Sequence, residues 1–487
     1  MKEMTENRTP RRPSPLVSIL PIAVLISLLF FTIRLLGSDA LGGGSQVCLL
    51  VATALCVLVG MAGYGVKWEE YDRAITQNIA GVSTALIILL VIGSLSAAWM
   101  LSGVVPTLIY YGVQIIHPQF FLLSTCLICA AISVMTGSSW TTIATIGIAL
   151  MGIGRAEGFD EGWTAGAIIS GAYFGDKVSP LSDTTVLAAS STGTPLFTHI
   201  RYMLFTTLPS LAVALVVFLV AGLLHAPGTP AEMMAFTSTL AERFHISLWV
   251  LVVPALTGLM IARKVPSIIT LFLSTMLAAV CMLLFQPEIV REIAGEGMSE
   301  ADTLLKGTLL SLCTSTGLET GNDVLNELVA TRGMAGMLGT VWLILCAMCL
   351  GGAMSASGML ESITSLFVRL AGRLSTMVAS TVGCGLFLNL ATADQYISII
   401  LTGNIFRDIY RQNGYETRLL SRTTEDAVTV TSVLVPWNSC GMTQSTVLGV
   451  STLTYLPYCF FNLISPFMSI LMAAIGYQIK PRRKEVQ

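Results

Sequence analysis

Long apolar segments follow one another along the chain, separated by short polar stretches. A helix needs about 20 apolar residues to cross the hydrocarbon of a bilayer. Further stretches, near 103–116, 163–190 and 425–446, are apolar but interrupted by polar residues. The pattern predicts an all-α polytopic membrane protein with about 10–12 crossings, together with half-helices that do not cross. The clear apolar runs lie near residues 16–36, 46–66, 80–101, 118–135, 141–154, 200–224, 247–262, 265–285, 335–354, 378–402 and 448–476.

Composition supports the same class of protein. Hydrophobic residues make up 54% of the chain and charged residues 11%, whereas an ordinary soluble domain carries about 25% charged residues. The net charge of −2 leaves no basic excess to bind nucleic acid. Most of the 11 cysteines sit inside apolar runs, so we interpret them as small buried apolar residues and not as zinc ligands. We expect no cofactor.

Basic residues at both ends indicate the topology. Lys2, Arg8, Arg11 and Arg12 precede an apolar run that is too long for a signal peptide. The C-terminal segment KPRRKE is also basic, so we expect both ends in the cytoplasm and an even number of crossings. The loop at Gly37–Ser45 lacks Lys and Arg, as an external loop should.

The interior of the chain divides into two parts that resemble each other. With a shift of about 255 residues, three interruptions recur in the same order. A duplicated unit with broken helices is typical of a secondary transporter. Such repeats are commonly inverted, and we expect inversion here, although the loop charges do not fix the orientation. The matched pairs are Ser102-Gly103 with Ser357-Gly358, Gly137–Trp140 with Thr392–Gln395, and Ser179–Asp183 with Val435–Ser439. We therefore expect cytoplasmic tails at 1–15 and 477–487, repeat halves at 16–246 and 247–476, and a polar central loop with interfacial helices at 286–334.

The densest set of charges within the apolar segments lies between Ser170 and Thr185. It contains Asp176, Lys177 and Asp183, surrounded by hydroxyl side chains. A charge in hydrocarbon costs at least about 2.5–3.5 kcal/mol, so such residues are candidates for function. Carboxylates, hydroxyls and free carbonyls at a broken helix are hard oxygen ligands that suit Na⁺ or H⁺. The alternative is a polar re-entrant loop that binds nothing.

Two further charged sets lie in the second half. Asp394 is a lone acid in an apolar run, unless it lies at a helix end near the headgroups. Arg422 and Asp426 are four residues apart and can share one helix face. For Arg422 and Glu425, the alternative is the cytoplasmic start of a helix. The histidines sit near the ends of apolar runs, so we interpret them as interfacial.

These motifs resemble a known family. The string GAYFGDKVSPLSDTTVLAA, Gly171 to Ala189, is similar to the signature of the NhaC family of Na⁺/H⁺ antiporters. The strings ATADQY, LSRTTEDAVTVTSVLVPWNSCG and TYLPYCFFNLISP resemble the second half of that family. The resemblance implies exchange of Na⁺ for H⁺ across the bacterial inner membrane, and a fold with inverted repeats and re-entrant hairpins. Family relatives couple malate and H⁺ to Na⁺ and lactate, and no motif separates the two activities.

Antiport requires a site that holds Na⁺ or H⁺ but not both. Protonation of a carboxylate removes the charge that binds Na⁺, and burial makes protonation accessible near neutral pH. We expect Asp176 and Asp183 to carry the ions, with Asp394 and Asp426 completing the site. The expected neutral oxygen ligands are Ser179, Ser182, Thr184 and Asn438, and the expected charge partners are Lys177 and Arg422.

Other functions stay open to different degrees. A small-carboxylate exchanger would use Lys177 and Arg422 to hold its substrate. An intramembrane aspartyl protease would need Gly-x-Gly-Asp, whereas Tyr173-Phe174 precede Gly175-Asp176 here. We therefore expect a transporter and not an enzyme. The expected partners are the lipid bilayer, Na⁺ and protons, with small carboxylates as the alternative, and a homodimer remains open.

Overall fold

The computed structural model describes residues 13–36, 43–225, 230–263, 265–297, 299–321, 325–326 and 329–479. Most of the predicted external loop at 37–45 and most of both basic tails lie outside these residues. The described part is helical, and an isolated β-bridge joins Thr316 to Thr331. The fold class predicted from the sequence, an all-α polytopic protein, is confirmed.

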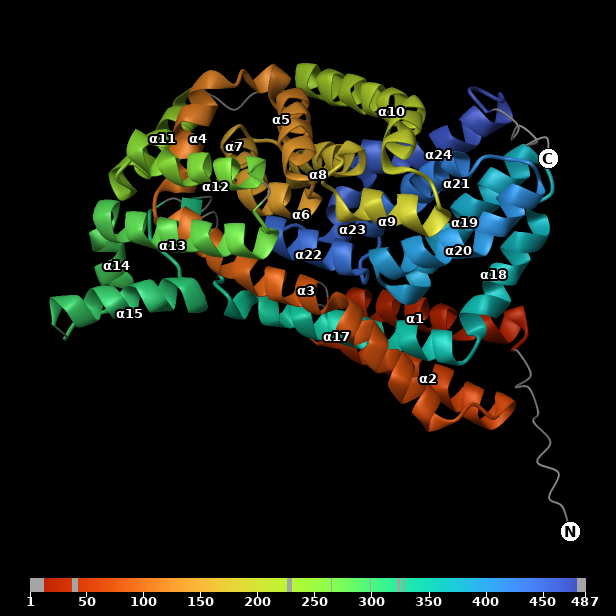
Figure 1. Ribbon diagram of the computed structural model, residues 1–487. Helices are drawn as coiled ribbons and strands as arrows, with labels where there is room; N and C mark the ends of the chain where they lie inside the picture. The colour runs from red at the N-terminus through yellow and green to blue at the C-terminus, as the bar shows by residue number, and fades with distance from the viewer. Residues whose placement is uncertain are drawn as a thin grey trace, which may run out of the picture.

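Among the described residues, eight helices are long and apolar enough to cross a membrane, or up to ten if each of two bent pairs counts as one span. The predicted count of crossings is met only at its lower end, because the run at 141–154 and the interrupted stretches form shorter helices (Figure 1). The main long helices are α1 (Pro15–Leu36), α2 (Gly44–Tyr64), α3 (Trp68–Leu101), α5 (Phe121–Thr136), α10 (Leu196–Leu224), α13 (Ser267–Phe285), α17 (Leu338–Ala356) and α19 (Leu374–Thr392).

Shorter helices fill the space between the long ones and carry most of the charged residues singled out above. They are α4 (Val104–Ile115), α6 (Ser139–Thr142), α7 (Ile148–Ala156), α8 (Glu161–Val178), α9 (Asp183–Thr192), α18 (Met359–Leu370), α20 (Gln395–Gln412), α21 (Thr417–Thr424), α22 (Ser439–Leu448), α23 (Thr452–Tyr455) and α24 (Phe460–Ala474). Two π-helical segments, η3 (Ile143–Gly147) and η6 (Glu425–Thr429), continue α6 and α21. The connections contain α11 (Pro230–Arg243), α12 (Val252–Ala262), α14 (Pro287–Ala294) and α15 (Glu300–Cys313).

The two halves break their helices in the same way. The turns after α3 and α17 pass through left-handed glycines, Gly103 (φ 85°) and Gly358 (φ 70°). The breaks after α5 and α19 use left-handed residues as well, Gly137 (φ 67°) and Ala393 (φ 56°). A left-handed residue ends a helix because its carbonyl no longer points along the helix axis. The repeat predicted from the sequence is therefore visible in the backbone.

The third pair of breaks shows the same local chemistry. Pro180 lies between α8 and α9, and Pro436 lies before α22. Proline removes a backbone donor and ends the preceding helix. The next helix then begins at a residue whose side chain accepts a backbone N–H, Ser182 for α9 and Asn438 for α22. Both of these capping side chains are buried, so the N-terminal ends of α9 and α22 lie inside the protein.

Helices α5 and α8 lie closely against each other (Figure 1). A side-chain carbon at Gly171 would run into the carbonyl oxygen of Cys126, and one at Gly175 would run into Ser133. The hydroxyl of Ser133 donates to the carbonyl of Ala172 at 2.6 Å. This contact fixes the last turn of α8, which carries Asp176 and Lys177.

Buried apolar side chains form two clusters. One is built mainly from α3, α4, α5, α8 and α13, and the other mainly from α1, α2, α17, α19 and α20. Trp140, next to the start of α6, packs against both. The broken helices therefore lie where the two apolar clusters meet, and their polar ends are enclosed by apolar packing.

Candidate ion site

Asp176 lies in the last turn of α8, with its side chain buried. The hydroxyl of Ser139, in the first turn of α6, donates to its Oδ2 at 2.6 Å. The hydroxyl of Ser182, the capping residue of α9, donates to its Oδ1 at 2.6 Å. Each carboxylate oxygen therefore faces the N-terminal end of a broken helix, where the partial positive charge of the backbone favours an anion.

Hydroxyl side chains surround the break between α8 and α9. Ser182 also contacts Thr184, with their hydroxyl oxygens 2.9 Å apart. Thr185 donates to the carbonyl of Lys177 at 2.9 Å. Ser179 instead donates to the carbonyl of Val134 at 2.8 Å and ties the break to α5. Of the predicted neutral ligands, Ser182 therefore contacts Asp176 and Thr184 contacts Ser182, whereas the Ser179 hydroxyl points toward α5.

Lys177 and Asp426 form an ion pair in which both side chains are fully buried. The lysine belongs to α8 in the first half, and the aspartate belongs to η6 in the second half. Thr206 of α10 donates to the same aspartate oxygen at 3.2 Å. A buried pair of this kind is stable only while both partners are present, so it links the two halves at one point.

Arg422 is fully buried beside this pair. Its Nε lies 3.9 Å from Oδ2 of Asp426, one helical turn away. None of its side-chain nitrogens has a hydrogen-bond partner within the described residues. Its guanidinium lies 5.0 Å from the centre of the Tyr202 ring, a favourable position for a cation. The predicted sharing of one helix face by Arg422 and Asp426 agrees with this geometry.

Glu425 is a buried acid that was not among the predicted site residues. We left open that it begins a cytoplasmic helix, but its side chain is fully buried. Neither carboxylate oxygen has a hydrogen-bond partner in the described part of the chain. The charges of Lys177, Asp176 and Asp426 all act on it. The sequence signal for a functional role of Glu425 is its position next to Asp426, in a polar run that ends at a proline.

Together these side chains form a five-residue charge cluster, consisting of Asp176, Lys177, Arg422, Glu425 and Asp426. All five are buried. When every member is ionised, the carboxylates outnumber the cations by one. Burying an uncompensated charge is costly, so the cluster is stabilised by one additional positive charge, either a proton or a metal cation.

Asp394 and Asn438 occupy the matching breaks of the second half. Asp394 is buried, begins α20, and accepts from the backbone of Ile397 at 2.9 Å and from Ser439 at 3.2 Å. Asn438 accepts from the backbone of Cys440 at 3.1 Å and donates to the carbonyl of Asn389 at 3.1 Å. Asp394 is therefore a buried acid that caps a helix, and this capping role explains its place in the apolar run.

Asp183 differs from the expectation of a buried carrier. Its side chain is exposed at the first residue of α9, where its Oδ2 accepts from the hydroxyl of Tyr396 at 3.2 Å. The physical reason is the cap: Ser182 turns inward to cap the helix, and the next residue must then point outward. The two aspartates that the sequence groups together therefore differ in exposure, with Asp176 buried and Asp183 exposed.

His199 also corrects an expectation, since we interpreted all the histidines as interfacial. Its side chain is fully buried, with Nδ1 2.8 Å from the hydroxyl of Ser421. Nε2 has no hydrogen-bond partner among the described residues. The charge of the Lys177 ammonium group acts on His199, so His199 lies near the charge cluster.

No group of three or more His, Cys, Asp or Glu side chains that could hold a metal ion occurs in the described part of the structure. A cation at Asp176 would therefore take its other ligands from hydroxyl and carbonyl oxygens, which suits Na⁺ and not a transition metal. The duplicated broken helices, with buried charges at their ends, define a multi-pass membrane protein of the secondary-transporter class.

Comparison with known proteins gives the family. The model of the Na⁺/H⁺ antiporter family matches residues 2–172 and 171–477. The Na⁺/H⁺ antiporter NhaC of Alkalihalophilus pseudofirmus is 35% identical over 430 residues, covering 88% of this chain and 89% of the relative. The chain belongs to the Na⁺/H⁺ antiporter family, and the resemblance noted in its sequence is confirmed.

Other relatives exchange organic substrates according to their names. The malate-2H⁺/Na⁺-lactate antiporter of Bacillus subtilis is 34% identical over 433 residues, covering 88% of this chain and 89% of the relative. The arginine/ornithine antiporter ArcD of Halobacterium salinarum is 33% identical over 473 residues, covering 96% of this chain and 93% of the relative. Family membership alone therefore does not fix the substrate.

Proposed function

We propose that this protein exchanges Na⁺ for H⁺ across the bacterial inner membrane, with both chain ends in the cytoplasm. The observation that carries the proposal is the five-residue charge cluster, in which the carboxylates outnumber the cations by one. A cluster with one excess negative charge attracts a cation, and binding of one positive charge makes the cluster neutral. Na⁺ and H⁺ can each supply that charge, and each makes binding of the other less favourable.

Asp176 is the proposed carrier. Its carboxylate accepts from the hydroxyl groups of Ser139 and Ser182, and the Thr184 hydroxyl lies 2.9 Å from that of Ser182. A hydroxyl can donate to an ionised carboxylate and can also turn a lone pair toward a cation. Protonation of Asp176 removes the negative charge, so the same oxygen atoms would hold Na⁺ only in the deprotonated protein. This alternation is the chemical requirement of antiport.

In this proposal, a contact with the second half couples ion binding to the conformational change. The Lys177–Asp426 pair joins α8 to η6, and alternating access requires such contacts between repeats to rearrange. We propose that Na⁺ binding at Asp176 weakens the pair, because the added positive charge repels Lys177. Asp394 and Asn438 cap the helices at the matching breaks of the second half.

Purified protein in liposomes with an internal pH dye tests the proposal. Adding Na⁺ outside, against an imposed pH gradient, should change the internal pH without any organic acid present. The empty liposome and the Asp176→Asn protein serve as controls and should show no Na⁺-dependent change. A sustained current that does not depend on the proton gradient would indicate a channel and contradict the proposal.

A second candidate is exchange of a small carboxylate together with Na⁺ and H⁺. The observation that favours it is Arg422, whose buried guanidinium has free hydrogen-bond donors on every nitrogen within the described residues. A guanidinium binds a carboxylate with two parallel hydrogen bonds. In the same liposomes, Na⁺ would then act only with malate or lactate on the opposite side. The Arg422→Lys protein would lose this effect, because an ammonium group cannot make the paired contact.

A further inference from the structure

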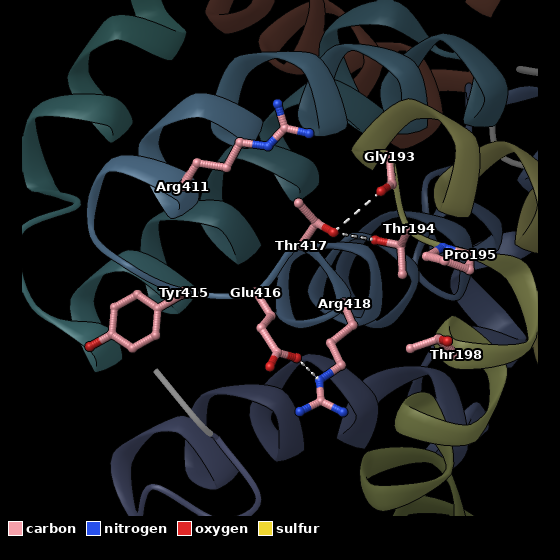
Figure 2. A pocket seen from close by; sticks show the side chains of 9 residues that line it. All are labelled: Gly193, Thr194, Pro195, Thr198, Arg411, Tyr415, Glu416, Thr417 and Arg418. Atoms are coloured by element: carbon pink, nitrogen blue, oxygen red, sulfur yellow. Dashed lines mark hydrogen bonds and ion pairs between the residues drawn. The ribbon is translucent and has the colours of Figure 1, made fainter. Parts of the chain in front are cut away.

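A pocket of about 510 Å³ opens between the α9–α10 turn and the α20–α21 turn (Figure 2). This volume falls within the range of about 300–1,000 Å³ that is usual for small-molecule sites. Apart from Gly193 and Pro195, the residues that line it have polar or charged side chains. They are Thr194, Thr198, Arg411, Tyr415, Glu416, Thr417 and Arg418. The pocket is separate from the five-residue charge cluster, none of whose members lines it.

The lining carries a positive charge in excess. It contains two arginines and one acid, and Glu416 pairs with Arg418, so the charge of Arg411 is not balanced by a lining carboxylate. Figure 2 shows Arg411 apart from that ion pair, on the other side of Thr417. Helices α10 and α21 both begin here without a side-chain cap. Their first backbone N–H groups add positive potential.

We propose that this pocket binds a small anion through its carboxylate or phosphate oxygens, and that the bound anion lowers the apparent KM for Na⁺. Arginine with neighbouring hydroxyl donors is the usual protein complement of such oxygens. A polar lining of this volume fits a hydrophilic dianion. The occupant could come from solution as a dicarboxylate or from the membrane as a lipid headgroup phosphate, and the two sources share the same chemistry.

A short chain of side chains connects the pocket to the charge cluster. The guanidinium of Arg418 lies 4.8 Å from the centre of the Tyr202 ring, and that of Arg422 lies 5.0 Å from the same centre. Arg422 is in turn 3.9 Å from Asp426. The positive field of these arginines opposes a cation in the cluster, and an anion in the pocket compensates for it. This second part of the inference rests on the proposed exchange of Na⁺, whereas the binding part does not.

Calorimetric titration of malate into purified protein in phosphatidylcholine nanodiscs tests the binding part. We expect saturable binding that weakens at least about tenfold in Arg411→Gln and in Arg418→Gln, since each removes a charged donor. Arg369→Gln, an exposed arginine outside the pocket, should bind malate as the unaltered protein does. Nanodiscs with added phosphatidylglycerol should show weaker malate binding if headgroup phosphate is the occupant, and the same affinity if the occupant comes from solution. Absence of saturable binding, or pocket variants that bind malate as tightly as the unaltered protein does, would overturn the inference.

Exchange assays test the coupling. Malate at equal concentration on both sides of the liposome membrane should lower the KM for Na⁺ at least about twofold. Arg411→Gln should keep its exchange without malate and lose the response to malate. Normal exchange with an unchanged KM in malate would overturn the coupling alone. Absence of Na⁺ exchange under all conditions would reject the proposed function and leave the binding result standing.

Discussion

At the scale of single residues, the position of a hydroxyl decides which aspartate can carry an ion. Asp176 and Asp183 belong to the same motif, but Ser182 between them turns inward to contact Asp176. Asp183 consequently points outward. The two aspartates therefore differ in burial and in ligands although they lie only one helix break apart.

Substitution of each aspartate should show that the two have different roles in exchange. Asp176→Asn should lower Na⁺/H⁺ exchange at least about 100-fold, because an amide neither ionises nor accepts a proton near neutral pH. Asp183→Asn should retain most of the exchange, since its carboxylate is exposed and its one described hydrogen bond comes from the Tyr396 hydroxyl. Initial rates of Na⁺-dependent pH change in liposomes measure both. Equal loss in the two variants would contradict the assignment of Asp176 as the carrier.

Glu425 should set the affinity for Na⁺. Glu425→Gln removes the excess negative charge of the five-residue charge cluster, so the apparent KM for Na⁺ should rise about tenfold, equivalent to about 1.4 kcal/mol. Glu69→Gln, an exposed acid at the start of α3, serves as the matched control and should leave the KM unchanged. An unaltered KM in Glu425→Gln would show that its carboxyl is neutral in the working protein.

The candidate residues could be found from the sequence only as far as charge in an apolar run reveals them. Asp176, Lys177, Arg422 and Asp426 were predicted on that ground, and the structure brings them together. Ser139 was not predicted, because a hydroxyl costs little to bury and leaves no comparable signal. Which face of a helix turns inward also requires the packing, as the exposure of Asp183 shows.

At the scale of helices, close packing of α5 on α8 holds the ion site in place. Gly171 and Gly175 lie where α8 touches the backbone and side chains of α5. If the close contact between α5 and α8 were lost, the last turn of α8 would shift, and Asp176 would shift with it. The spacing of these two glycines matches the small-residue pattern by which membrane helices approach one another.

A methyl group at this contact should destabilise the protein. Gly171→Ala should lower the free energy of unfolding by about 1–3 kcal/mol, because the added carbon overpacks the contact with Cys126. Gly258→Ala in α12, where nothing lies within 4 Å of the added carbon, should be neutral or slightly stabilising. Thermal unfolding in detergent compares the two. A normal melting temperature for Gly171→Ala would show that α5 and α8 are less closely packed than described.

The helix breaks were more predictable than the number of crossings. Glycine, proline and capping residues mark Gly103, Gly137 and Pro180 in the sequence, and the chain breaks at each. The count of crossings was predicted less well, because an apolar run such as 141–154 can also form short helices buried by the protein itself. The π-helical segment η6 had no signal, since its geometry depends on the packing around Glu425.

At the scale of the whole molecule, the fully buried Lys177–Asp426 ion pair joins the halves across 249 residues of sequence. Lys177→Met or Asp426→Asn alone leaves a buried partner charge, which should cost about 3–5 kcal/mol of stability. The double variant should be more stable than the two single effects added together, because neither partner of this pair is left charged without the other. Unfolding temperatures of the three variants measure this coupling. Losses that simply add in the double variant would show that the two residues do not act as a pair.

The most direct measurement is the release of protons when Na⁺ binds. Purified protein in weakly buffered detergent solution, with a pH dye, should release protons as Na⁺ is added, because Na⁺ and H⁺ compete for Asp176. Asp176→Asn should release none, and K⁺ at the same ionic strength controls for salt effects. Equal proton release from Asp176→Asn, or Na⁺ binding to the unaltered protein without proton release, would contradict the central claim that one carboxylate holds either ion.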